Sequence, residues 1–159
     1  MEVRKVDKKK LSLLGKVLKV VLTIVMILGG LVLLCLPLIT KVIDIHFDMF
    51  IIMVYPCGIG FLYIVYLFTQ MFKSLEKSKP FVIDNSIRLK KSMYISYVIG
   101  FLILISILVT NIYNYYSLQL KVALLLISIL FFGIGVAFYI LSELFKQATI
   151  YKEENDLTI

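Results

Sequence analysis

Long apolar runs separated by short polar stretches are the main feature of the hydrophobic pattern along the chain. Each run is close to the roughly 20 residues that an α-helix needs to cross the hydrocarbon core of a bilayer. None has the period-two alternation of a membrane barrel strand, and a helix satisfies its backbone hydrogen bonds internally. The pattern therefore predicts four transmembrane helices, over residues 17–40, 49–72, 93–113 and 122–145.

Composition supports a membrane location for the whole chain. Hydrophobic residues make up 61% of the 159 residues, whereas charged residues make up 17%. A soluble domain of this size cannot bury so much apolar surface, and disordered chains are poor in Leu, Ile, Val and Phe. We therefore expect one all-α, polytopic membrane domain over residues 1–159.

Basic residues gather at the ends of the apolar runs. All but Lys41 and Lys121 of the 17 Lys and Arg lie near the N-terminus, in residues 73–92 or in residues 146–159. Positive charges that flank membrane spans stay on the cytoplasmic side. We therefore expect a cytoplasmic N-terminus (residues 1–16), a cytoplasmic central loop and a cytoplasmic tail. This arrangement accounts for the net charge of +7 without direct nucleic-acid binding.

The interiors of the four runs contain no ionisable acid or base. Proton relays and ion-coupled transporters need such groups at depth in the membrane. A coupled transporter is therefore disfavoured. No nucleophile and base, and no set of metal ligands, converge in the sequence, so we expect neither enzymatic activity nor a cofactor.

Cys35 and Cys57 lie within apolar runs, where packing is a simpler interpretation than a disulfide. His46 stands between Asp44 and Asp48 in a short connection. One histidine and two loop carboxylates indicate a solvated turn rather than a metal site.

Small residues recur at four-residue intervals in the third and fourth runs. Ser92, Ser96 and Gly100 form one series, and Gly133 with Ala137 forms the other. Small side chains at this interval let helices approach closely in lipid. We interpret both series as packing faces within one bundle, and the alternative is a face that forms a homo-oligomer.

The central loop contains an amphipathic stretch after Pro80. Phe81 and Ile87 interleave with polar and basic residues, and Asp84 or Asn85 can serve as a helix N-cap. The stretch predicts a short interfacial helix between the second and third spans, with its basic residues at anionic headgroups.

The fourth helix is expected to continue past the membrane into an acidic tail. Glu143 lies close to Lys146 at the cytoplasmic end, where pairing with a basic group is the simplest role and gating or partner binding is the alternative. The tail either keeps the chain soluble at its end or docks onto the central loop. The groups that such docking would join are Glu153, Glu154 and Asp156 with Arg88, Lys90 and Lys91.

Two motifs carry a resemblance to a known family. They are Lys79-Pro80-Phe81 with Asn85 and Leu89, and Glu154-Asn155-Asp156-Leu157-Thr158-Ile159 preceded by Glu143, Phe145 and Ala148. At these residues the chain resembles a bacterial four-helix membrane family catalogued as a domain of unknown function, often encoded beside a Cro-type helix-turn-helix regulator. The resemblance implies a bacterial cytoplasmic membrane and a soluble regulator as a partner.

These observations predict a non-enzymatic membrane module whose cytoplasmic face binds or tethers a partner such as a small transcriptional regulator. The alternative is a small transport, channel or immunity-type protein that acts through its helix bundle. The residues expected to form the interaction face are Pro80, Phe81, Asn85, Arg88, Glu143, Glu154, Asn155 and Asp156.

Overall fold

The computed structural model describes residues 2–43, 48–77, 81–113 and 117–157, and nearly all of them are helical. The helices are α1 (Glu2–Ile43), α2 (Asp48–Glu76), α3 (Ile83–Tyr113) and α4 (Leu118–Leu157). Each helix contains one of the predicted spans, and all four are long and apolar enough to cross a membrane. The prediction of an all-α protein with four membrane helices is confirmed.

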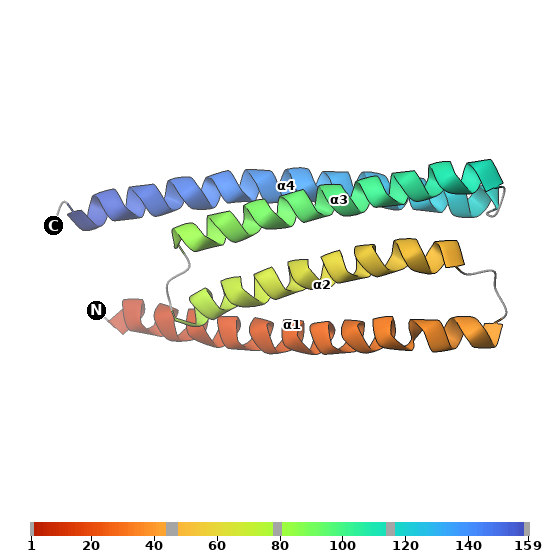
Figure 1. Cartoon of the computed structure of the whole chain (residues 1–159). Helices are drawn as coiled ribbons and strands as arrows, with labels where there is room; N and C mark the ends of the chain where they lie inside the picture. Colours follow the sequence, from red (N-terminus) through yellow and green to blue (C-terminus); the bar gives the residue numbers. More distant parts are fainter. Residues whose placement is uncertain (1, 44–47, 78–80, 114–116, 158–159) are drawn as a thin grey trace.

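The helices run antiparallel, so both termini lie at the same end of the molecule as the end of α2 and the start of α3 (Figure 1). We call this end the terminal end. It unites residues 2–16, 73–77, 81–92 and 146–157, as the sequence predicted. The assignment of the terminal end to the cytoplasm remains a prediction.

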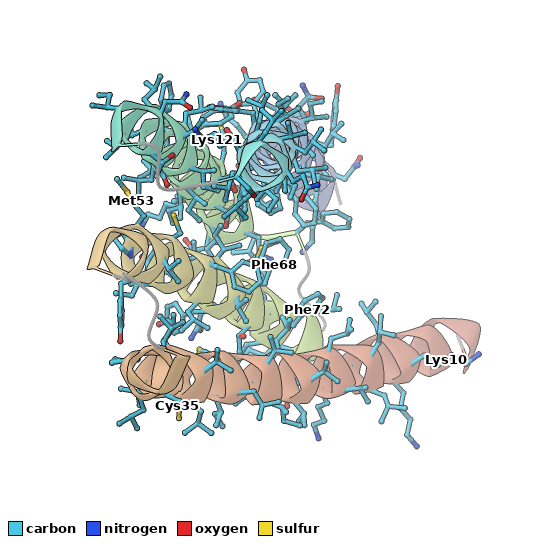
Figure 2. All side chains as sticks on the ribbon, turned by 90° about the vertical axis from the view of Figure 1, so that its right-hand side faces the viewer. Lys10, Cys35, Met53, Phe68, Phe72 and Lys121 are labelled. Atoms are coloured by element: carbon cyan, nitrogen blue, oxygen red, sulfur yellow. The ribbon has the colours of Figure 1, made fainter. Side chains whose placement is uncertain are left out.

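The four helices do not form a closed bundle: α2, α3 and α4 pack against one another, and α1 lies against α2 at one side. Within the described part of the chain, the backbone of α1 approaches only α2, α2 also approaches α3, and α3 also approaches α4. Figure 2, which looks along the helices, shows α1 diverging so that Lys10 lies far from α3 and α4. A large part of the apolar surface of α1 is therefore left for lipid to cover.

Small residues let α3 and α4 approach closely. Buried positions of α3 recur at intervals of three, four or seven residues: Asn85, Leu89, Ser92, Ser96, Ile99, Ser106 and Thr110. Those of α4 recur every seven: Ser128, Gly135, Ser142 and Thr149. These spacings are typical of left-handed packing of two helices along a seam.

The small-residue prediction is therefore confirmed for α3 and wrong for α4. Gly133 and Ala137 are exposed, and a Cβ atom on Gly133 would meet nothing within 4 Å. Gly135, two residues away, faces α3 instead, because a Cβ there would collide with the ring of Tyr97. Gly133 and Ala137 remain available to the oligomer that the sequence left as an alternative.

Glycines also bring α1 close to α2. A Cβ on the buried Gly15 would lie 2.6 Å from the backbone nitrogen of Glu76, so only glycine fits there. Farther along, the Tyr55 hydroxyl donates to the Leu33 carbonyl at 3.0 Å. The two helices are thus in contact at both ends of their shared length.

The interfacial helix that the sequence predicted is not a separate element. The stretch after Pro80 is helical, but it forms the first turns of α3 and continues into the span without a break. Because α3 begins at Ile83, Asp84 and Asn85 lie inside its first turn rather than at the N-cap. The carboxylate of Asp84 still lies at the positive end of the helix dipole, where it is favourable.

The cysteines form no disulfide: Cys35 is exposed and Cys57 is partly exposed, and both are free. The connection predicted as a solvated turn, with Asp44, His46 and the side chain of Asp48, lies outside the described residues.

Candidate functional site at the terminal end

The structure places the predicted interaction residues in two groups. One group lies where α3 begins beside α4 and comprises Phe81, Asn85, Arg88 and Glu143. The other lies in the last turns of α4 and comprises Glu154 and Asn155. Pro80 lies outside the described residues, as does the side chain of Asp156, although α4 includes Asp156.

The first group is assembled by contacts between α3 and α4. The hydroxyl of Ser86 donates to the Ser142 carbonyl, and the hydroxyl of Ser142 donates to the Ser86 carbonyl, both at 2.9 Å. One turn farther toward the terminal end, the rings of Phe81 and Phe145 lie 5.9 Å apart. These contacts hold the start of α3 against α4.

Asn85 and Arg88 form a polar link from α3 to α2. Asn85 is 2% exposed, and its Oδ1 accepts a hydrogen bond of 2.7 Å from Nη1 of Arg88. The same nitrogen lies 3.5 Å from the hydroxyl of Ser74. Asn85 therefore holds the guanidinium of Arg88 in place.

Arg88 has no carboxylate within ion-pair distance among the described residues. Asp84 lies one turn earlier on the same helix, but it is exposed and makes no ion pair with Arg88. Glu76 instead pairs with Lys19 at 3.2 Å. The half-buried Arg88 thus keeps its positive charge uncompensated by the described part of the chain.

An apolar cavity of about 260 Å³ adjoins this polar link. Its walls come from α2, α3 and α4: Phe68, Met71, Phe72, Leu75, Asn85, Leu89, Leu141 and Phe145. Asn85 is the one polar residue among them. The sequence identified Asn85 but missed the aromatic and aliphatic walls, because nothing in an apolar run marks which side faces a cavity.

A second cavity, of about 330 Å³, lies nearer the other end of the molecule. It also lies between α2, α3 and α4, and its walls are Met53, Val54, Cys57, Gly58, Phe61, Ile103, Ser106 and Leu124. No carboxylate or basic side chain lines it.

The second group of predicted residues stands apart from the first. α4 remains helical through Leu157, and Glu154 lies nine residues, or about 13 Å of helix, beyond Phe145. Tyr151, Glu154 and Asn155 are all exposed. Residues three and four positions apart share a face of a helix, so these three side chains form one exposed surface.

Among the described residues, the predicted docking of the tail onto Arg88, Lys90 and Lys91 is not observed. No ion pair joins the described tail residues to Arg88, Lys90 or Lys91. The physical reason is that a continuous helix carries Glu153 and Glu154 away from the start of α3. Glu143 is half-buried and likewise makes no ion pair within the described residues, so the simple pairing role expected for it is not seen.

The ion pair between Lys19 and Glu76 is a feature that the sequence did not reveal. The two residues are 57 positions apart, and they meet because α1 and α2 run antiparallel. No group of three or more His, Cys, Asp or Glu that could hold a metal ion occurs in the described part of the chain.

Comparison with known proteins identifies the family. The model of the family described as "Protein of unknown function (DUF2975)" matches residues 16–159. No curated protein and no solved structure matches the chain. Because the match covers all four spans, the chain belongs to the DUF2975 family.

Proposed function

We propose that this member of the DUF2975 family is a non-enzymatic docking module that holds a soluble partner at the cytoplasmic face of a bacterial membrane. The observation that carries the proposal is the exposed surface of Tyr151, Glu154 and Asn155 on the last turns of α4. We call it the tail surface.

The tail surface lies on the part of α4 that extends past the predicted membrane span. α4 has 40 residues and is about 60 Å long, whereas a hydrocarbon core is about 30 Å thick. The twelve residues of α4 after Phe145 therefore extend about 18 Å past the predicted span. A surface at that distance is accessible to a soluble protein.

The chemistry of the tail surface suits recognition of a helix by a groove. Tyr151 is 66% exposed and offers an aromatic ring, and Glu154 and Asn155 are exposed polar residues beside it. Partners that bind single helices use an apolar pocket with polar groups at its rim. Aromatic residues are frequent among the side chains that dominate such interfaces.

The partner class that we propose is a small helix-turn-helix regulator, because the chain resembles membrane proteins that are often encoded beside one. A regulator held at the bilayer has less access to DNA. The module would then act by sequestration, and release of the regulator would permit DNA binding.

The test is affinity purification of the full chain from membranes in mild detergent, with mass spectrometry of what co-elutes. We expect a soluble regulator with the unmodified chain. Glu154→Ala and Asn155→Ala should each reduce its recovery at least about tenfold, the size of effect typical of important interface side chains.

Glu153→Ala is the matched control. It removes the same charge from an exposed neighbour that points to a different side of the helix, so recovery should stay unchanged. Equal losses for Glu153→Ala and Glu154→Ala would contradict the tail surface as the docking site. Absence of a regulator in all samples would overturn tethering.

A transport, channel or immunity-type function is the alternative. Transport of a polar solute would need a polar path between the helices, whereas the two cavities between α2, α3 and α4 are lined mainly by apolar residues.

A further inference from the structure

We infer that the cavity of about 260 Å³ and the guanidinium of Arg88 together bind one anionic phospholipid of the leaflet at the terminal end. The apolar walls accept part of an acyl chain, and Arg88 binds the phosphate. This site is distinct from the tail surface, so the inference does not depend on the proposed docking function.

The depth of the cavity fits a lipid. Phe72 and Phe145 line it, and each is the last residue of a predicted span. Arg88 lies five residues before the predicted start of the third span, beyond the same boundary. The cavity therefore lies at the edge of the hydrocarbon core and Arg88 at headgroup level, which is the order of chain and phosphate in a phospholipid.

Arg88 has hydrogen-bond donors to spare. Within the described residues only its Nη1 donates, to Asn85 and Ser74. No buried polar side-chain atom of the described residues lacks a hydrogen-bond partner, so Nε and Nη2 lie on accessible surface. A guanidinium with one edge fixed and another accessible is suited to bidentate binding of a phosphate.

The surrounding charge favours an anionic headgroup. Lys73 lies among the cavity residues of α2 and Lys77 follows them, and Lys91 lies three residues after Arg88 on the same side of α3; all three are exposed. Of the nearby carboxylates, Glu76 is paired with Lys19, and Asp84 and Glu143 make no ion pair with Arg88. The net field at this site is therefore positive.

A lipid explains the combination of features better than a protein partner does. The cavity lies between helices that span the membrane, where phospholipid is the most abundant molecule. A soluble protein would have to insert a side chain to the depth of Phe68, whose ring contacts Phe138 at 5.4 Å inside both predicted spans.

The test is native mass spectrometry of the full chain in detergent, titrated with phosphatidylglycerol or phosphatidylcholine. We expect phosphatidylglycerol to bind at one saturable site, and Arg88→Gln to weaken that binding about tenfold, as loss of a charge-assisted hydrogen bond predicts. Lys90→Gln removes an equal charge from an exposed neighbour and should change the affinity less than twofold.

Two further experiments separate the contribution of the acyl chain to binding from that of the phosphate headgroup. Leu141→Trp, which fills the cavity from a partly exposed position on α4, should weaken phosphatidylglycerol binding while leaving the helical content measured by circular dichroism unchanged. Glycerol 3-phosphate, which has the phosphate but no acyl chain, should fail to compete.

Three results would overturn the inference. Equal binding of phosphatidylcholine would show that the site does not require an anionic headgroup. Equal losses for Arg88→Gln and Lys90→Gln would show that only the general surface charge matters. Competition by glycerol 3-phosphate would indicate a site for free phosphate esters. Glu154→Ala should leave lipid binding intact, so failure of the docking proposal and failure of the lipid site are distinguishable.

Discussion

The α3–α4 pair and the α1–α2 pair are held together by different means. α3 and α4 meet along small buried residues, and Ser128, Ser86 and Ser142 donate hydrogen bonds from one helix to the other. α1 contacts α2 through glycines, one ion pair and the hydrogen bond from Tyr55 to the Leu33 carbonyl, and none of the residues in its most apolar stretch is buried. Association of helices in lipid depends on close packing and hydrogen bonds rather than on hydrophobic burial. The comparison teaches that α3 and α4 are the more closely packed pair and that, in the described part of the chain, α1 is attached through α2.

The largest effect should come from overpacking the seam between α3 and α4. Gly135→Leu forces a side chain into the space held by the ring of Tyr97 and should lower the free energy of unfolding by about 1–3 kcal/mol. Unfolding in mixed detergent micelles, followed by circular dichroism, measures the change.

Gly133→Leu is the control for that substitution. It lies two residues away on the same helix, is exposed, and has open space around it, so its effect should stay within about 0.5 kcal/mol. If both variants were equally destabilised, the seam would not run along Gly135.

A smaller effect is expected from the hydrogen bonds that cross the same seam. Ser142→Ala removes a buried hydroxyl that donates to the Ser86 carbonyl and should cost about 1 kcal/mol, within the range measured for bonds between membrane helices.

Ser92→Ala provides the comparison within one helix. The Ser92 hydroxyl is equally buried, but it donates to the Arg88 carbonyl of its own helix, so its loss should cost less than that of Ser142. Equal costs would show that hydrogen bonding across the seam adds nothing to packing.

The smallest effect concerns α1. Lys19→Gln removes the ion pair with Glu76, and because these side chains are 37% and 25% exposed, the loss should be about 0.5 kcal/mol and should shrink with added salt. A double-mutant cycle with Glu76→Gln isolates the coupling energy. Zero coupling at low salt would leave the glycine contacts and the hydrogen bond from Tyr55 to the Leu33 carbonyl to attach α1 to α2.

The sequence predicted the helices well and their neighbours poorly. A long apolar run with charged ends has one stable form in a bilayer, so the spans follow from hydropathy alone. The face that a helix turns toward its neighbour does not, because residues facing lipid and residues facing protein are equally apolar. Gly133 and Ala137 at an interval of four therefore looked like a packing face, whereas Ser128, Gly135 and Ser142 at intervals of seven form the actual one.

The candidate site was predictable in part for the same reason. Polar residues in an apolar chain attract notice, so Asn85, Arg88 and Glu154 could be identified from sequence. Their grouping depended on geometry: α4 remains helical where a flexible tail was considered, and this separates Glu154 from Arg88. The link between Lys19 and Glu76 depended on the register of two helices, which no local pattern specifies.

The unbroken course of α4 has a consequence for direction. Thr149 and Ser142 are buried toward one side of this helix, and the tail surface follows within two turns. The direction in which Tyr151 points around the helix axis is therefore fixed by the way α4 packs in the membrane. One residue inserted after Lys146 would rotate the tail surface by about 100° around the helix axis without altering any of its side chains. A partner bound there would have a fixed orientation relative to the membrane helices, which a flexible tail would not impose.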